Sequence, residues 1–154
     1  SSAVDAPVQL TDQELYDVRS LSISPDGKQF LLCLSRYPIG SVIEEYAVDQ
    51  PLRIKATFQP HVAGETSSGA IFGGAAYVHD GMDIVFTAAS AGCEFDYNVY
   101  QISAVTGSHL LALTHGQGAI NAITVDRDGT SFFVRDGHSF ALDPNTRALR
   151  EEKL

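Results

Sequence analysis

The segment Ser24-Pro25-Asp26-Gly27-Lys28, which precedes the apolar run Phe30-Leu31-Leu32-Cys33-Leu34, decides the fold class of this chain. Proline presets φ and glycine accepts a positive φ, so the Pro-Asp-Gly sequence predicts a tight turn between two strands. Before the turn, residues 19–24 alternate polar and apolar side chains, which is typical of a half-buried strand. After the turn, residues 30–35 follow as an apolar run of strand length, which indicates a strand covered on both faces.

The Asp-Gly pair of this turn recurs at residues 80–81 and 128–129. The copies are roughly 50 residues apart, a period in the range of propeller repeats. Three residues after each glycine stands a large apolar residue, namely Phe30, Ile84 and Phe132. We therefore interpret the chain as three copies of one unit and take these three residues as equivalent positions.

Each unit is expected to contain four strands. The expected strands are 19–24, 30–35, 42–48 and 53–58, then 74–78, 83–88, 98–103 and 109–114, then 121–125, 131–135, 138–142 and a weak 147–153. Four-stranded antiparallel units at this period are typical of β-propeller blades. The sequence therefore predicts an all-β chain of three blades, at about residues 16–58, 70–114 and 119–154.

Composition and charge narrow the class of partner. Hydrophobic residues make up 44% of the chain, and 19 acidic against 10 basic residues give a formal net charge of −9. This charge disfavours a nucleic-acid partner, since phosphate binding needs a basic surface, and it disfavours an anionic membrane surface. No run of about 18 apolar residues is present, so no membrane insertion is expected.

The first unit resembles a known blade motif. Its Ser-Pro-Asp-Gly-Lys segment, the apolar strand after it and the later Glu45-Tyr46-Ala47-Val48-Asp49 resemble the blades of TolB-like propellers. The same motif occurs in propeller domains of the prolyl oligopeptidase family. Thr106-Gly107 followed by Leu111-Ala112-Leu113-Thr114 resembles the end of such a blade. The resemblance covers nearly the whole chain and weakens from the first unit to the third.

This resemblance implies a non-enzymatic binding or protein-interaction scaffold, periplasmic or extracellular, without a cofactor. An alternative is a propeller segment of an oligopeptidase-like hydrolase whose catalytic domain is absent from this chain. No Gly-x-Ser-x-Gly nucleophile elbow is present in the sequence,. A small propeller lyase or hydrolase that uses axial acidic and histidine residues is a third reading. We favour the scaffold because the other two need residues or domains that the sequence does not show.

Three blades do not close a ring, because propellers have four to eight blades and closure protects their edges. Two explanations stay open: the chain is a piece of a longer protein, or two copies join into a six-bladed homodimer, the blade number that the resemblance implies. We favour the homodimer. Val8-Gln9-Leu10-Thr11 resembles an outer strand and is a candidate to close the blade at the other end or in a partner chain.

Fold analogy places a binding site at the axial face, where loops between second and third strands and between blades gather. The candidate ligand- or partner-binding residues in these loops are Arg36, Tyr37, His61, Glu65, Glu94, Asp96, Tyr97 and His115. Residues 61–73 form a long loop rich in small residues, which is the best candidate for a mobile or ligand-contacting segment,. The competing interpretation is that these loops are simply solvated connections.

Metal and catalytic signals are weak. The five histidines show no i, i+2 or i, i+4 pairing, so no metal site is expected,. The segment 126–130 resembles the start of a calcium loop, but position twelve would be Gly137, so we expect a turn. The pairs Glu44-Glu45 and Glu151-Glu152 are expected to be solvated charges. No catalytic residue is predicted.

Two cysteines leave the redox compartment open,. Cys33 lies inside an apolar run and is expected to be buried as a small hydrophobic residue. Cys93 lies in a loop rich in glycine and alanine.

Overall fold

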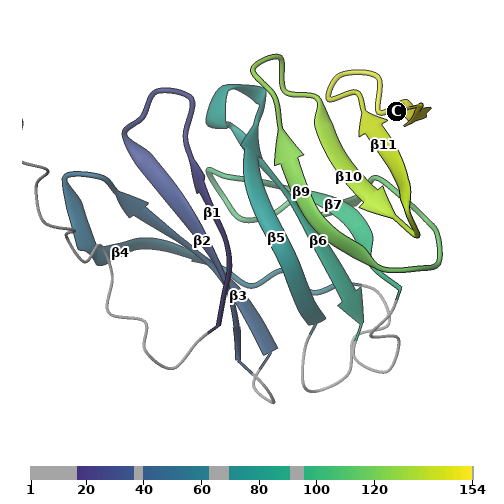
Figure 1. Cartoon of the computed structure of the whole chain (residues 1–154). Coiled ribbons are helices and arrows are strands. Elements are labelled where there is room, and N and C mark those ends of the chain that lie inside the picture. The colour runs from purple at the N-terminus through teal and green to yellow at the C-terminus, as the bar shows by residue number, and fades with distance from the viewer. Residues whose placement is uncertain (1–16, 37–39, 63–69, 91–95, 154) are drawn as a thin grey trace, which may run out of the picture.

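The computed structural model describes residues 17–36, 40–62, 70–90 and 96–153. They form three antiparallel sheets of four strands each, which follow one another along the chain (Figure 1). The strands of the first sheet are β1 (Asp17–Ile23), β2 (Gln29–Arg36), β3 (Gly40–Ala47) and β4 (Gln50–Phe58). Those of the second are β5 (Ala70–Val78), β6 (Asp83–Ser90), β7 (Asn98–Ser103) and β8 (Leu111–Ala112). Those of the third are β9 (Ile120–Val125), β10 (Ser131–Arg135), β11 (His138–Leu142) and β12 (Leu149–Glu152).

The Ser-Pro-Asp-Gly-Lys segment makes the predicted turn through its own side chains. The hydroxyl of Ser24 donates to Oδ1 of Asp26 at 2.6 Å, and the amide of Gln29 donates to that hydroxyl at 3.0 Å. The amide of Lys28 donates to the same Asp26 oxygen at 3.0 Å. Gly27 has a φ of 71°, which a glycine adopts without strain,. Serine, aspartate and glycine therefore each have a separate role in the turn.

The third turn is one residue shorter than the first, which corrects the expected alignment of the units. In the first turn the amide of Ser24 donates to the carbonyl of Gln29, whereas in the third Asp126 donates to Thr130. Ser131 pairs with Val125 as Phe30 pairs with Ile23. Phe30 and Phe132 are therefore not equivalent positions, and it is the next residue, Phe133, that is buried against the second sheet.

Asp126 serves this third turn in place of the serine. Its Oδ1 accepts from the amides of Asp128 and Thr130, at 2.9 and 3.0 Å. The segment that resembled a calcium loop is therefore a turn closed by its own aspartate.

Two hydrophobic clusters join the sheets in sequence. The first contains Leu31, Cys33 and Ile43 of the first sheet together with Tyr77 and Phe86 of the second. The second cluster joins the second and third sheets. Its buried members are Ala76, Val78, Val85, Val99, Ile120, Ile123, Phe133 and Leu142. The first strand of each blade (β1, β5 or β9) is called its innermost strand. Within both clusters the innermost strand of one blade covers the face of the blade before it: β5 lies against β1, β2 and β3, and β9 lies against β5 and β6.

Buried polar contacts reinforce the first joint and overturn one expectation. Glu44 and Glu45 are 6% and 4% exposed, so the prediction that they are solvated is wrong. Oε2 of Glu45 accepts from the hydroxyl of Tyr77 at 2.6 Å, and Lys55 Nζ lies 3.4 Å from its Oε1. These partners replace water around the carboxylate. Glu44 accepts from the hydroxyl of Tyr46 at 2.5 Å on the same strand.

The other local expectations have mixed outcomes. Glu151 is exposed, as predicted, and pairs with His138. Cys33 is a fully buried free thiol, as predicted, while Cys93 lies outside the described residues. The fourth strand of the second unit, Leu111–Ala112, is shorter than the expected 109–114, and His109 has a φ of 60°, which is outside the β region and accounts for its later start,. The possible closing strand at residues 8–11 lies outside the described residues. Within the described ranges no helix has the length and apolarity to cross a membrane.

Candidate functional site

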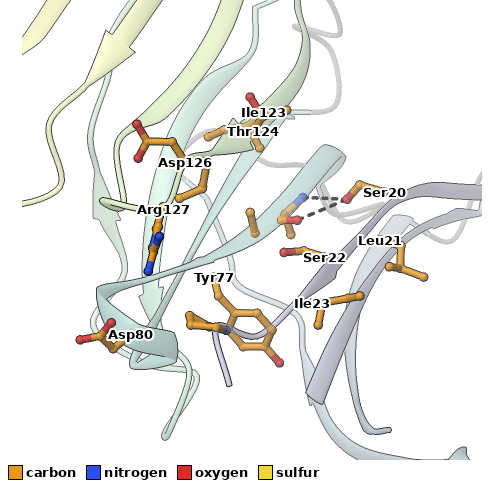
Figure 2. A pocket seen from close by; sticks show the side chains of 14 residues that line it. Ser20, Leu21, Ser22, Ile23, Tyr77, Asp80, Ile123, Thr124, Asp126 and Arg127 are labelled. Atoms are coloured by element: carbon orange, nitrogen blue, oxygen red, sulfur yellow. Dashed lines mark hydrogen bonds between the residues drawn. The ribbon is translucent and has the colours of Figure 1, made fainter. Parts of the chain in front are cut away.

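The innermost strands of the three blades enclose a groove of about 580 Å³ (Figure 2). It is lined by Ser20, Leu21, Ser22, Ile23 and Pro25 of the first blade, Ala75, Ala76, Tyr77 and Asp80 of the second, and Ile123, Thr124, Val125, Asp126 and Arg127 of the third. Strands β1, β5 and β9 are each the edge strand of their sheet. Their free edges therefore turn backbone N–H and C=O groups toward the axis, in addition to the side chains. We call this cavity the axial groove.

The Asp-Gly turns supply the charged groups of the axial groove. Asp80 follows β5, and Asp126 and Arg127 follow β9. Figure 2 shows Arg127 on the opposite side of the groove from Ser20 and Ser22 of β1. A smaller hollow of about 340 Å³ adjoins the groove among the same turns. One guanidinium and two carboxylates therefore lie beside a lining of hydroxyls and small apolar side chains.

The second of these turns is held in place by His79. Its Nδ1 lies 2.6 Å from Oδ2 of Asp83, and its Nε2 lies 2.9 Å from the carbonyl oxygen of Pro144 in the third blade. His79 and Asp80 both have positive φ values, 52° and 54°, which non-glycine residues rarely adopt,. The imidazole contacts thus fix a strained turn at the end of the groove and connect it to the next blade.

The contact between β1 and β5 sets the shape of the groove floor. The Ser20 hydroxyl accepts from the amide of Ala75 at 3.0 Å and donates to the carbonyl of Ala75 at 3.4 Å (Figure 2). Gly74 lies beside this bridge, and a Cβ there would be in ordinary van der Waals contact with the Ser20 oxygen, at 3.6 Å. The two edge strands are therefore bridged at one point and open on either side of it.

The residues predicted from the loops belong to the other end of the blades. In an antiparallel sheet, the turn between the first and second strands lies at one end, and the loop between the second and third strands lies at the other. The groove reaches the end with the turns between first and second strands. Tyr37, Glu65 and Glu94 lie outside the described residues, Arg36 ends β2, and His61 is exposed.

Two of the predicted candidates, Asp96 and Tyr97, contact the same residue at that end. Oδ1 of Asp96 accepts from the amide of Gly118 at 2.9 Å, and the amide of Tyr97 donates to the carbonyl of Gly118 at 3.1 Å. His115 is exposed on the same connection. These contacts join the loop before β7 to the segment that leads into β9.

Arg135 is a residue that the sequence analysis missed. Its Nη2 donates to the carbonyl of Tyr97 at 2.5 Å and to Oδ1 of Asn98 at 2.9 Å. The same Asn98 oxygen accepts from Thr114 and from the amide of Gly116. An arginine that ends an otherwise apolar strand was the available signal. The network ties the third blade to the second.

The chemistry of the axial groove favours binding. In the ranges that the structure describes, no group of three or more histidine, cysteine, aspartate or glutamate side chains is arranged to hold a metal ion. The groove offers hydroxyls, apolar side chains, strand edges and both signs of charge. Such a lining can contact an extended polypeptide through both its backbone and its side chains.

Comparison with solved structures identifies the fold. TolB from Acinetobacter baumannii superposes with a TM-score of 0.63 at 21% identity, over 92% of this chain and 33% of that chain. A TolB structure from Agrobacterium tumefaciens gives a TM-score of 0.57 at 18% identity, over 85% of this chain and 44% of that one. No protein-family profile and no curated protein matches the sequence. The chain therefore has a TolB-like propeller fold and spans less than half the length of these neighbours.

Proposed function

We propose that this chain is a non-enzymatic protein-interaction scaffold that binds an extended polypeptide segment in the axial groove. The observation that carries the proposal is the groove of about 580 Å³ between three edge strands. Edge strands bind extended peptides by main-chain hydrogen bonds, and neighbouring side chains provide specificity.

The side chains of the groove indicate the kind of segment that fits. Ser20 and Ser22 present hydroxyls from β1, and Val125 presents an apolar surface from β9. Asp80 and Arg127 add charge at the end formed by the turns. A segment with alternating polar and apolar residues and a charged end would match this order, because successive side chains of a strand point to opposite sides.

A peptide selection tests this function. Peptides displayed on phage are selected on the full chain, and the dissociation constant of the best synthetic peptide is measured by calorimetry. The groove variant is Arg127→Glu, and its matched control is Arg53→Glu, an exposed residue of the outer strand β4. We expect the groove variant to weaken binding roughly tenfold or more and the control to leave it unchanged.

Mass spectrometry of the recovered peptide provides the second half of the test. A scaffold returns the peptide intact after prolonged incubation. Cleaved or otherwise altered peptide would overturn the non-enzymatic assignment, and equal affinities of Arg127→Glu and Arg53→Glu would remove the groove from the binding site.

A further inference from the structure

The face of the third sheet that points away from the second sheet has a shallow apolar hollow of about 540 Å³. Its lining includes Ala122, Thr124, Phe132, Val134 and Ser139. Phe132 pairs with Thr124 and Val134 with Ser139 across the ladders, so these side chains share one face. Val134 is 42% exposed. We call this surface the open face of the third blade.

The equivalent face of the first two blades is covered by the next blade. In the first blade, Ser20 of the innermost strand pairs with Cys33, and in the second blade Gly74 pairs with Thr87. Both Cys33 and Thr87 are 0% exposed. What covers them is an innermost strand, since β5 lies against the first sheet and β9 against the second. The open face of the third blade therefore lacks the strand that its two counterparts have.

A regular register connects the innermost strands at the two existing joints. Ser20 contacts Ala75 through the 3.0 Å hydrogen bond, and a Cβ at Gly74 would lie 3.7 Å from Cγ2 of Ile123. At each joint a small residue of one blade thus meets a defined residue of the next. The small residues Ser20 and Gly74 occupy equivalent positions in their ladders. Ala75 and Ile123 are equivalent to each other as well, because they pair with Phe86 and Phe133 on the second strands of their blades.

The same register identifies the residues that would form such a joint at the two uncovered faces, the outward face of the first blade and the open face of the third blade. Ala122 precedes Ile123 and occupies the small-residue position of the third blade. Leu21 pairs with Leu32 and occupies the position of Ala75 and Ile123 in the first blade. Ala75 and Ile123 are 2% and 7% exposed, whereas Leu21 is 52% exposed and its neighbour Ile23 is 60% exposed. Both halves of a third joint of the same kind are therefore present and unpaired among the described residues.

We propose that a second copy of this chain inserts its β1 into the open face of the third blade, with Leu21 of one copy against Ala122 of the other. A two-fold axis along the groove makes the same joint twice, so two arcs of three blades close one ring of six. The outward face of the first blade suits this mode, because its middle is already buried, with Phe30 at 3% and Leu32 at 4%, while Leu21 and Ile23 of the innermost strand are open. Leu21 also lines the axial groove, but the joint is argued from the register of the innermost strands and not from what the groove binds.

Charge-swap variants test the joint in solution. Light scattering coupled to size exclusion is expected to give twice 16.5 kDa for the full chain. Leu21→Glu alone and Ala122→Lys alone are each expected to give 16.5 kDa, because each places an unpaired charge in both joints,. An equimolar mixture is expected to recover the dimer, which then has one unaltered joint and one Glu–Lys joint. Val105→Glu, at a 70% exposed turn residue, is the control and is expected to remain a dimer.

Cysteine crosslinking tests the register itself. In a Cys93→Ser background, Leu21→Cys combined with Ala122→Cys is expected to form a covalent dimer when oxidised glutathione is added. Val105→Cys combined with Ala122→Cys is expected not to. Circular dichroism establishes that every variant is folded. A monomeric parent chain at about 100 µM, or a dimer that neither charge variant dissociates, would overturn the proposal; a monomer would assign the open face to blades of a longer polypeptide.

Discussion

The hydroxyl of Tyr77 on β5 donates a 2.6 Å hydrogen bond to Oε2 of Glu45 on β3, across the joint between the first two blades. Glu45 is 4% exposed, and burial is the main cause that raises the pKa of Tyr77, followed by this hydrogen bond. The raised pKa keeps the phenol neutral, so the phenol is the donor and Oε2 of Glu45 is the acceptor. A buried charge is tolerated at this joint because a residue of the neighbouring blade completes its hydrogen bonding.

Removing this donor is expected to destabilise the chain. Tyr77→Phe leaves the buried carboxylate short of a partner, and we expect the free energy of unfolding to fall by about 1–3 kcal/mol. Urea denaturation followed by circular dichroism measures the change. Tyr100→Phe is the matched control, since its half-buried hydroxyl has no hydrogen-bond partner among the described residues, and we expect a change within about 0.5 kcal/mol. Equal effects of the two substitutions would contradict the assigned role of Glu45.

The buried thiol of Cys33 is expected to be unreactive in the folded chain. Burial raises its pKa from 9.0 to about 12, and the side chain is 0% exposed. The thiolate is the reactive form, so it is scarce as well as inaccessible at pH 8. In a Cys93→Ser variant, we expect a disulfide reagent to modify Cys33 only as fast as the blades separate, and quickly in urea. Complete modification within seconds under native conditions would show that the first joint is open.

The first turn predicts a specific pH dependence of stability. The Ser24 hydroxyl, and then the amide of Lys28, hold the pKa of Asp26 below its usual 3.8. A carboxyl group with a lowered pKa in the folded state stabilises that state above the unfolded value, and this contribution disappears as the pH falls through the folded value. Urea midpoints measured between pH 2 and 6 should therefore fall less steeply on acidification for Asp26→Asn than for the parent. Parallel profiles would mean that the aspartate does not serve the turn as its charged form.

Gly116 is expected to tolerate no side chain. A Cβ at this position would lie within 3 Å of the Arg135 guanidinium, which would have to leave Tyr97 and Asn98. We expect Gly116→Ala to reduce the free energy of unfolding by about 1–3 kcal/mol. Gln117→Ala, at the exposed next residue, is the control and should have little effect. If both substitutions are neutral, the arginine network does not hold the third blade to the second.

Local sequence signals predicted the blades well, because turn chemistry and strand periodicity act over a few residues. The Pro-Asp-Gly turn and the apolar run after it lie where they were expected, and the three four-stranded sheets follow. The alignment of Phe132 with Phe30 was wrong because Asp126 closes a turn one residue shorter, and a shift of one residue moves a side chain to the other face of a strand,.

The candidate site depended on contacts between blades, which a single sequence does not reveal. Glu45 looks like a surface charge until Tyr77, which is distant in the sequence, is placed beside it. The groove was missed for a similar reason, since its lining comes from three innermost strands and not from the long loops. The sequence did contain one usable signal. Leu21 and Ile23 are large apolar residues of the innermost strand of the first blade, and both are exposed in the structure.

Hydrogen exchange measured by mass spectrometry, with and without a selected peptide, tests the axial groove most directly. The bound peptide is expected to slow exchange of the amides of β1, β5 and β9, whose free edges line the groove. The outer strands β4 and β12 should exchange at the same rate in both samples. Protection confined to residues 59–62, 96–98 and 114–118 would instead place the binding site on the loops at the opposite end of the blades and contradict the account.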